Sequence, residues 1–478
     1  YALMAGLSIP TQRTAIMLCI VFAARWLRRD LRTGHTLGLA LIAILIVDPF
    51  APLAVGAWLS FGAVAIIVLA LSGRLRQLNP VSSFARVQLA MTTGLLPLLL
   101  VSFGSVSLVS PLANAIAIPL FTLLVVPLVL LGAMLAALSP TLAGWPLGLA
   151  TDVLGLLWIA LDWFAEQPLA LWHFPTVGWA ALVAMGLGSA MLVLPAIWPI
   201  RLLGLACCVH VFFIRPPTPA PGDYELAVLD VGQGLAVVVR THDHVLLYDA
   251  GPAFQTGRDA AQLAILPYLH ARGIRALDAL VVSHGDLDHS GGLESILREV
   301  PVRRVVLGQS VAPWPNRAVR CASGQSWSWD SVTFEIVHPS SSFVGAKNDS
   351  SCVVRVSGAG GTALLTGDIE ISGEAALLRA GIGPSDVVIV PHHGSRTSSS
   401  ESFVESLAPR VAVAAAGYRN RWGLPKAEVI ERWRRAGAWT YATSESGAVE
   451  VSVRADHTIE VREHRRTNGR YWSRTAAD

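Results

Sequence analysis

Charge is scarce in the first part of this 478-residue sequence. Residues 1–214 carry nine Arg and five Asp or Glu, which is 14 of the 69 charged residues (36 basic plus 33 acidic). An ordinary soluble domain carries about 25% charged residues, so this part is not expected to be one. Residues 215–478 carry the other 55 charges (69 − 14) and are expected to form a soluble domain.

Cysteine and signals for processing or ATP binding are scarce as well. The five cysteines include no Cys-x-x-Cys pair and are too few and too scattered for a disulfide framework. No GxxxxGK[ST] pattern occurs, so a step driven by ATP has to come from a partner. The chain begins at Tyr1 directly in apolar sequence, without a signal-peptide layout, and we interpret it as a fragment that lacks its natural N-terminus.

Long apolar segments are what the first part has instead. Stretches of about 20 apolar residues recur, which is the length that crosses a bilayer as a helix, and backbone in lipid must satisfy its own hydrogen bonds. We therefore expect residues 1–214 to be a polytopic membrane domain of about eight spans. The expected spans are 3–24, 36–52, 53–71, 87–107, 111–138, 142–163, 176–194 and 197–214.

Arginine placement predicts the orientation of these spans. Arg residues lie at 25–32, at 74–86 and at Arg201, and these loops share one side if every span crosses, whereas the opposite loops carry acidic residues and no Arg. By the positive-inside rule the Arg side is cytoplasmic. The last span then exits outward and puts the second part on the outer, periplasmic face of the inner membrane; one re-entrant hairpin would reverse this.

Three polar residues, Gln12, Arg13 and Asn114, are the functional candidates in the membrane domain. Polar and ionisable groups at membrane depth are costly and usually mark a pathway or a pair. An interfacial position explains Arg13 equally well. Prolines within the spans suggest broken helices, which are tolerated where backbone lines a cavity or packs on protein.

A Pro-rich linker at 215–222 precedes a segment with a different period. Short β-rich runs with turn residues between them indicate a second domain at 223–463, followed by a basic tail at 464–478. Strands are expected at 224–229, 235–241, 244–249, 277–283, 303–307, 331–337, 351–357, 361–366, 386–391, 410–415 and near 438–454, with helices at 258–272, 371–380, 400–407 and 426–436. Two runs of strands with interspersed helices suggest a two-sheet sandwich with helices outside.

Three groups of possible metal ligands follow expected strands. They are SHGDLDHSGG at 283–292, LLTGD at 364–368 and PHHGS at 391–395. Imidazole and carboxylate together suit zinc, manganese or iron. Any one group alone is compatible with a surface loop, but three at strand ends predict a metal site with enough ligands for two ions. Two ions about 3.5–4 Å apart can activate water and stabilise the leaving oxygen of a phosphodiester.

These motifs in this order resemble the metallo-β-lactamase superfamily, whose αββα sandwich fits the expected strands. That superfamily's usual HxHxDH loop has Asp286 here in place of its second His, and a harder oxygen ligand favours manganese over zinc, with magnesium also compatible. The whole chain resembles the ComEC-type competence proteins. Residues 7–13 look like that family's membrane motif, and residues 229–234, 249–251 and 348–351 look like motifs of its hydrolase domain.

The resemblance implies an inner-membrane channel for single-stranded DNA with a metal-dependent nuclease that hydrolyses the strand not imported. The implied metal ligands are His284, Asp286, Asp288, His289, Asp368 and His393. The first two look like ligands of one ion, the next two like ligands of a second, and Asp368 like a bridging carboxylate. Asp288 and His392 are the catalytic candidates, and His392 is a ligand or a proton donor. Residues expected to orient ligands or contact substrate are Asp230, Gln233, Asp249, Asn348, Ser350 and Ser351, although a turn role also explains Asp249.

One departure leaves alternatives open. Family members commonly carry a His near residues 420–426, where this sequence has Leu424 and Lys426. The hydrolase-like domain is then either a catalyst or a module that only guides DNA; a membrane-anchored hydrolase of another phosphodiester is the third reading.

The tail carries arginines and two aromatics that suit phosphates and unpaired bases, or it is a solvated tail. Expected partners are DNA, membrane lipid, an external DNA receptor, a cytoplasmic ATP-driven motor and a second copy of the chain.

Overall fold

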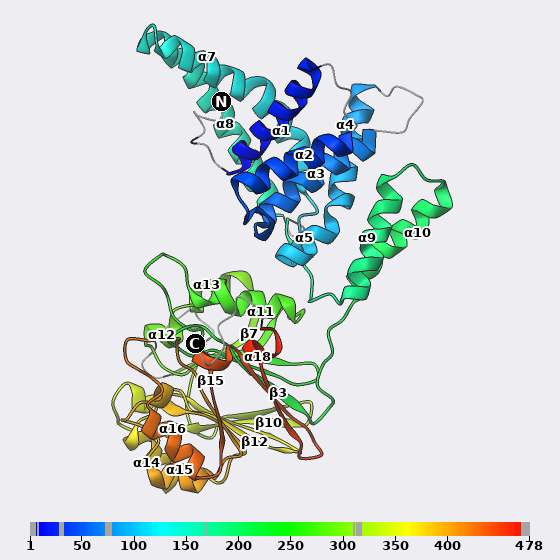
Figure 1. The fold of residues 1–478 in the computed structure, drawn as a ribbon. Coiled ribbons are helices and arrows are strands. Elements are labelled where there is room, and N and C mark those ends of the chain that lie inside the picture. The colour runs from blue at the N-terminus through cyan, green and yellow to red at the C-terminus, as the bar shows by residue number, and fades with distance from the viewer. Residues whose placement is uncertain are drawn as a thin grey trace. The chain divides into compact units, whose positions relative to one another are not determined.

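The computed structural model describes residues 6, 9–27, 33–71, 79–167, 170–308, 311 and 318–469. The chain divides into two compact units, Tyr1–Arg215 and Pro216–Asp478, of which the first is helical and the second is built mainly from strands (Figure 1). The division falls in the Pro-rich segment, where few backbone donors are available for regular structure.

Apolar helices make up the first unit. They are α1 (Ile9–Trp26), α2 (Thr33–Val47), α3 (Val55–Leu71), α4 (Pro80–Gly94), α5 (Leu96–Phe103), α6 (Ser110–Leu120), α7 (Val126–Ala136), α8 (Pro140–Ala165), α9 (Trp179–Val193) and α10 (Trp198–Val209), with the short helical turns η1 (Ala51–Leu53), η2 (Phe121–Val125) and η3 (His210–Phe213). Strands β1 (Ser105–Val106) and β2 (Trp172–His173) pair antiparallel. Each expected span overlaps at least one of these helices.

The helices of the first unit differ in whether they are long enough to cross a membrane. Among the described residues, Ser110–Ala136 and Pro140–Ala165 are long and apolar enough to cross a membrane, and α4 with α5, bent by 42°, gives a third if the pair is one span. Pro97 in the first turn of α5 accompanies this bend. Large apolar side chains such as Trp145 and Leu138 are about 80% exposed, as a lipid-facing surface requires. The full set of about eight spans stays a prediction.

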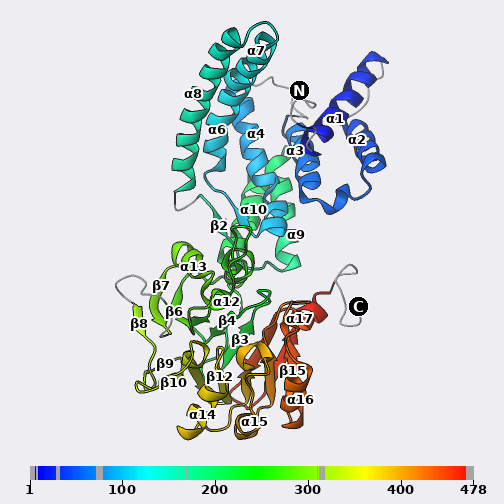
Figure 2. The ribbon, with the colours of Figure 1, turned by 90° about the vertical axis from the view of Figure 1, so that its left-hand side faces the viewer.

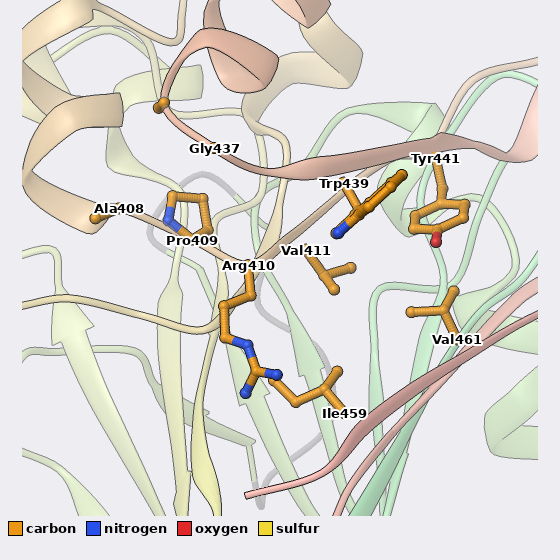
Figure 3. Close-up of a pocket in the computed structure, with 10 residues that line it drawn as sticks. Ala408, Pro409, Arg410, Val411, Gly437, Trp439, Tyr441, Ile459 and Val461 are labelled. Atoms are coloured by element: carbon orange, nitrogen blue, oxygen red, sulfur yellow. The ribbon is translucent and has the colours of Figure 1, made fainter.

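Two sheets form the second unit (Figure 2). The eight-stranded sheet has the order β17-β16-β3-β4-β5-β6-β7-β8, and the seven-stranded sheet has the order β15-β14-β13-β12-β11-β10-β9. The strands are β3 (Tyr224–Val228), β4 (Val237–Arg240), β5 (Val245–Tyr248), β6 (Leu277–Val282), β7 (Val302–Leu307), β8 (Ala318–Arg320), β9 (Ser326–Trp329), β10 (Val332–His338), β11 (Val353–Gly358), β12 (Gly361–Leu365), β13 (Val387–Ile389), β14 (Val411–Ala414), β15 (Trp439–Ala442), β16 (Val449–Val453) and β17 (Ile459–Glu463). The edge strands β15 and β17 line a shallow pocket beside the start of β14 (Figure 3).

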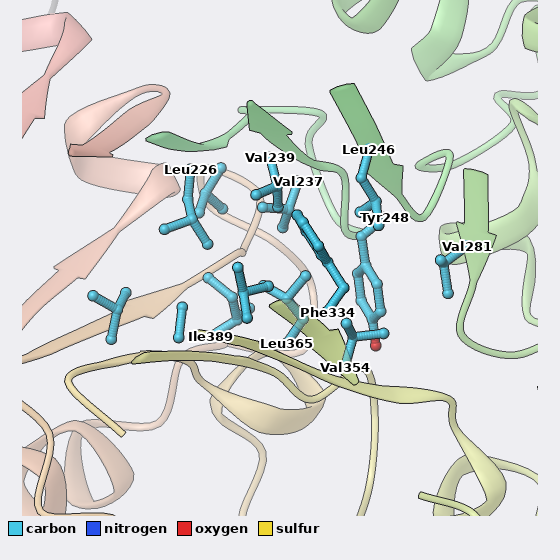
Figure 4. Close-up of a cluster of buried hydrophobic side chains, with 14 of the residues drawn as sticks. Leu226, Val237, Val239, Leu246, Tyr248, Val281, Phe334, Val354, Leu365 and Ile389 are labelled. Carbon is cyan, nitrogen blue, oxygen red and sulfur yellow. The ribbon is translucent and has the colours of Figure 1, made fainter. Parts of the chain in front are cut away.

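A continuous apolar core fills the space between the sheets (Figure 4). Leu226, Val237 and Leu246 project from one sheet, and Phe334 and Leu365 from the other, and all five are almost completely buried. Each such side chain contributes roughly 1.5–3 kcal/mol to folding by leaving water. The strands that supply them are rich in β-branched residues, which pack well on a pleated surface.

A disulfide between Cys321 and Cys352 lies in the same core, with 5.9 Å between the two Cα atoms. No framework of disulfides was expected from the sequence, and this single bridge is not one. Its partners are 31 residues apart in the chain, a separation that carries no local signal for pairing.

Helices cover the outer face of each sheet and complete the expected αββα sandwich. η4 (Ala261–Ile265), α11 (Leu266–Ala271) and α13 (Leu293–Glu299) pack apolar residues on the eight-stranded sheet. α14 (Ile371–Arg379), α15 (Glu401–Leu407) and α16 (Ala427–Arg435) do the same on the seven-stranded sheet. The remaining helical turns are α12 (Leu287–Ser290), η5 (Asn348–Ser350), η6 (Pro391–Gly394), α17 (Thr443–Ser446) and α18 (His464–Thr467).

Candidate metal centre

The carboxyl ends of parallel strands bring the ligand groups together. β5 and β6 run parallel in one sheet, and β12, β13 and β14 run parallel in the other. Asp249 follows β5, the 283–292 loop follows β6, Asp368 follows β12 and His393 follows β13. Ligand sites of such sheets form beyond the carboxyl ends of the strands because the connecting loops gather there.

Asp288, His289, Asp368 and His393 form one group of four donors. One ligand atom from each lies within 4.8 Å of the others. His289 Nε2 is 3.2 Å from His393 Nε2 and 3.1 Å from Asp368 Oδ1, and His393 Nε2 is 3.4 Å from Asp288 Oδ2. Three of the residues are buried, whereas the side chain of Asp288 is 35% exposed, so the group is open on the Asp288 side.

Hydrogen bonds outside the group turn its lone pairs inward. His289 Nδ1 lies 2.7 Å from the Asp249 carboxylate and His393 Nδ1 lies 2.8 Å from the Ala415 carbonyl oxygen. Both partners only accept hydrogen bonds, so each ring carries its hydrogen on Nδ1, and a neutral ring presents the Nε2 lone pair to the centre. Two such nitrogens 3.2 Å apart, beside a buried carboxylate, need a cation between them. The residues therefore fit a divalent ion.

The electrostatics of the group agree with this. Burial lowers the pKa of the His289 and His393 imidazoles, but nearby carboxylates, Asp368 above all, outweigh burial and raise both pKa values above the ordinary one. Burial also raises the pKa of the Asp368 carboxyl, and the two imidazoles more than reverse this and hold it well below its usual range. Without an ion, protons supply the positive charge, so ion binding must release protons.

Asp249 supports the group through three hydrogen bonds. Besides His289, its fully buried carboxylate accepts from the Ser283 amide at 2.6 Å and from the Ser283 hydroxyl at 2.8 Å. Ser283 Oγ in turn lies 3.0 Å from His284 Nδ1 and accepts its hydrogen. Asp249 thus orients His289 directly and His284 through Ser283. Its backbone has a φ of 61°, a left-handed conformation that Asp and Asn tolerate better than most residues.

The two expected ligands of a first ion lie beside the group of four. His284 is buried, and its Nε2 has no hydrogen-bond partner among the described residues. Asp286 Oδ2 is 3.4 Å from that nitrogen, but the other oxygen of Asp286 contacts the ammonium of Lys347. An ion held by His284 and Asp286 therefore shares the Asp286 carboxylate with the Lys347 ammonium, which already neutralises its charge.

His392 lies beside Asp368, outside the group of four. Its Nε2 is 3.8 Å from Asp368 Oδ2, and its Nδ1 is 3.0 Å from Glu370 Oε1 and 3.1 Å from the Thr397 hydroxyl. The side chain is 24% exposed, compared with 3% for His393. His393 is therefore the inward residue of the pair and His392 the outward one, a distinction that the sequence left open.

The other expected residues divide into two sets. Ser351 Oγ lies 3.4 Å from His284 Nδ1 and accepts from the Asp368 amide at 3.2 Å, so Ser351 reaches the centre. Asn348 and Ser350 lie one turn earlier; Asn348 contributes its carbonyl oxygen to Ser351, and Ser350 donates to the Lys347 carbonyl oxygen.

Asp230 and Gln233 belong to a turn that packs against the main chain of Asp288. The Asp230 carboxylate pairs with Arg465 at 3.1 Å, and Gln233 Oε1 accepts from the Gly417 amide at 3.3 Å. In the same turn a Cβ atom at Gly234 would lie 2.3 Å from the Asp288 carbonyl oxygen. Only glycine permits this approach.

In the helical unit, Arg13 and Asn114 contact different residues. Arg13 is buried in α1, with Nη1 3.4 Å from Ser60 Oγ of α3, and Asn114 donates to Ser110 Oγ at 3.2 Å. Gln12 also makes polar or electrostatic contacts. Arg13 is thus buried between α1 and α3.

Several residues of the centre carried no signal in the sequence. Ser283, Lys347 and Ala415 act through contacts with residues 34 to 61 positions away or through a main-chain oxygen. Ser283 is the first residue of the 283–292 motif, but no role of its own was expected for it from the sequence. In the basic tail, Arg465 and Arg466 are described, whereas residues 470–478 lie outside the described residues.

Comparisons with known proteins fall into the same two parts. Residues 1–199 match the family model described as competence protein, and residues 229–418 match that of the metallo-beta-lactamase superfamily. The chain is 38% identical to the competence protein ComA of Neisseria gonorrhoeae over 95% of its own length, and 30% identical to recombination protein 2 of Haemophilus influenzae over 97%. It spans 63% of the length of each relative. Among solved structures, it is similar to the metallo-beta-lactamase fold protein YhfI of Bacillus subtilis, with 12% identity, a TM-score of 0.31 and coverage of 46% of this chain and 95% of that one.

Proposed function

Because the chain belongs to the ComEC-type competence proteins, we propose that it takes part in DNA uptake as an inner-membrane channel for single-stranded DNA. Its second unit acts in this proposal as a metal-dependent phosphodiesterase that hydrolyses the strand not imported. The observation that carries the catalytic part is the convergence of Asp288, His289, Asp368 and His393 with their lone pairs inward.

A divalent ion bound there supplies Lewis-acid stabilisation of a phosphoryl oxygen and acidifies water. The chain's own residues do the rest. Asp249 and the Ala415 carbonyl hold the two imidazoles in the tautomer that binds an ion. Asp288 is the most exposed of the four donors, so in this proposal the substrate reaches the centre from its side. His392 is held by Glu370 and Thr397 beside Asp368 and is partly exposed, which suits a proton donor to the leaving oxygen.

The donor set favours one tightly held ion. Two imidazoles and two carboxylates suit manganese, with zinc and magnesium as the other candidates. A second ion at His284 and Asp286 binds more weakly in this proposal, because Lys347 already neutralises Asp286. We therefore expect two bound ions only at high metal concentration.

Two observations support an outer, periplasmic position for the second unit. The arginines of the first part favour a cytoplasmic position for the loops that contain them. The Cys321–Cys352 disulfide is independent of that pattern, and disulfides persist in oxidising compartments rather than in the cytosol. A hydrolase on the outer face meets incoming duplex DNA before a single strand crosses. In this proposal, an external DNA receptor, membrane lipid, a cytoplasmic ATP-driven motor and a second copy of the chain are the remaining partners.

The second candidate is a channel whose hydrolase-like unit only guides DNA. Leu424 and Lys426, which stand where the resemblance to the family implies a His, favour it. Against it, His393 completes a four-donor group without that residue, and a guiding module has no need of buried, inward-facing lone pairs. Hydrolysis of another phosphodiester is the third candidate, and substrate comparison separates it from the first.

A nuclease assay on the full chain in detergent tests the proposal. With manganese, the wild-type chain is expected to cut labelled DNA, and a chelator is expected to stop it. His393→Ala is expected to abolish cutting, while the matched control His457→Ala, in the β16–β17 hairpin, keeps it. A folded, manganese-loaded wild-type chain that leaves DNA intact would favour the guiding module; cutting of other phosphodiesters but not DNA would favour the third candidate.

A further inference from the structure

A loop at residues 417–426, between β14 and α16, has both ends against the metal centre. At its start, the Gly417 amide donates to Gln233 Oε1. Gly417 follows two residues after Ala415, whose carbonyl oxygen accepts from His393 Nδ1. At its end, the Lys426 amide donates to the Gly394 carbonyl oxygen at 2.9 Å. A Cβ atom at Gly394 would lie 2.6 Å from Pro425 Cβ, so the loop packs directly on the residue that follows His393.

Hydrogen bonds of one side chain within the loop hold its middle in place. The Asn420 amide group donates to the Gly417 carbonyl at 2.8 Å and to the Leu424 carbonyl at 2.6 Å, and its oxygen accepts from the Leu424 amide at 2.9 Å. One side chain thus ties the two ends of residues 418–423 together. The loop is a preformed arch, and ligand binding to it costs little ordering entropy.

Aromatic and basic side chains project from the arch. Tyr418 and Trp422 are 42% and 48% exposed, and the guanidinium groups of Arg419 and Arg421 lie 5.2 Å and 4.3 Å from their ring centroids. Lys426 adds a third cation, and residues 416–427 contain no acidic residue. Exposed rings interleaved with cations are the surface that unpaired nucleotides bind, because rings stack on bases and cations neutralise phosphates.

We propose that residues 418–426 form a stacking platform that holds unpaired nucleotides of the DNA strand beside the metal centre. Trp422 and Tyr418 stack on bases, and Arg419 and Arg421 contact the flanking phosphates. The proposal rests on the proposed function, because it assigns DNA as the polymer at that centre. The segment in which this chain lacks the family's His thus has a binding role of its own.

Fluorescence anisotropy of a labelled single-stranded DNA oligonucleotide with the full chain in detergent and chelator tests this without cutting. Trp422→Ala is expected to weaken binding about fivefold or more, the factor for loss of one stacked base, whereas Trp422→Phe keeps most of the affinity. The matched control is Trp439→Ala: Trp439 is 74% exposed on the same sheet and pairs with Val411 at the opposite end of β14 (Figure 3). It is expected to bind like wild type.

The salt dependence tests the binding of phosphates separately. In Arg419→Gln/Arg421→Gln, the slope of log affinity against log salt is expected to fall by about 1.4, or 0.7 for each phosphate that is no longer neutralised. Arg379→Gln, an exposed arginine on α14, is expected to leave the slope unchanged. The platform is refuted if Trp422→Ala and the double Arg variant both bind single-stranded DNA as tightly as their controls. If the proposed function is wrong instead, the wild-type chain binds manganese and the oligonucleotide but cuts no DNA.

Discussion

The support that Asp249 gives to the centre leads to a sharp prediction for Asp249→Asn. The substitution keeps the size of the side chain and tolerates the φ of 61°. It replaces the oxygen that accepts from His289 Nδ1 and from the Ser283 hydroxyl with an amide that donates. To avoid facing a donor, His289 must move its hydrogen to Nε2, and that nitrogen then has no lone pair for an ion.

The expected loss follows from this change of tautomer. Removing a carboxylate that orients a ligating His typically lowers metal affinity 10- to 100-fold, which is about 1.4–2.7 kcal/mol. His284 is affected as well, because it is oriented through Ser283, so we expect the upper half of that range. The metal-free variant should still fold, because its oxygen can accept from the Ser283 amide as Asp249 Oδ1 does.

Titration calorimetry of manganese into the metal-free full chain measures this loss, with thermal unfolding as the check on folding. The matched control is Asp278→Asn at the start of β6, the strand end opposite the centre, where the carboxylate accepts from Val245 and Arg303 instead. Asp278→Asn should bind manganese like wild type. If Asp249→Asn binds manganese as tightly as wild type while Asp278→Asn is also unchanged, the tautomer argument is wrong.

Three further predictions concern protons, the disulfide and Lys347. Because the pKa values of His289 and His393 are raised in the metal-free chain, manganese binding should release protons and strengthen as pH rises through those values; calorimetry in buffers of different ionisation enthalpy checks this, and a pH-independent affinity contradicts it. By the same linkage, protonation of these two imidazoles stabilises the metal-free fold. This contribution is complete below their unfolded-state pKa of about 6.5 and is lost as pH rises through their raised pKa values in the folded chain. Cys321→Ser/Cys352→Ser should lower the free energy of unfolding by about 3–4 kcal/mol for a 31-residue separation, measured by denaturant titration; a difference under about 1 kcal/mol refutes it. Lys347→Met should release Asp286 and raise manganese bound per chain at high metal concentration, as measured by metal analysis after equilibrium dialysis; unchanged binding means that Lys347 does not compete.

Local sequence patterns made the two-sheet sandwich and the position of its metal centre predictable. Runs of β-branched residues ended in His or Asp, and these three groups at strand ends predicted one metal site. Residues 284–289 follow a strand of one sheet, and residues 368 and 393 follow strands of the other. β8, β9 and β17 were missed because they are short or exposed on one face: β9 alternates Ser with Trp, and β17 alternates apolar with charged residues. α13 was missed because it follows a Gly pair without an N-terminal capping side chain.

Contacts between distant residues were not predictable in the same way. The Lys347–Asp286 contact joins residues 61 positions apart, and Asp249 reaches His289 across 40 positions. Neither spacing follows a helix or strand period, so only the folded chain reveals the pairing. In the membrane unit, hydropathy located the apolar segments, and the prolines within the spans suggested broken helices such as the α4–α5 pair, whose break lies inside the expected span 87–107.

The central claim is that four converging donors hold the ion with which the chain cuts DNA. The most direct measurement is a single titration of manganese into the metal-free full chain, following bound manganese and DNA cleavage in the same samples. Cleavage is expected to rise in step with occupancy of one tight site, and Asp368→Ala is expected to lose both together. Cleavage that appears without bound manganese, or that survives in Asp368→Ala, would contradict it.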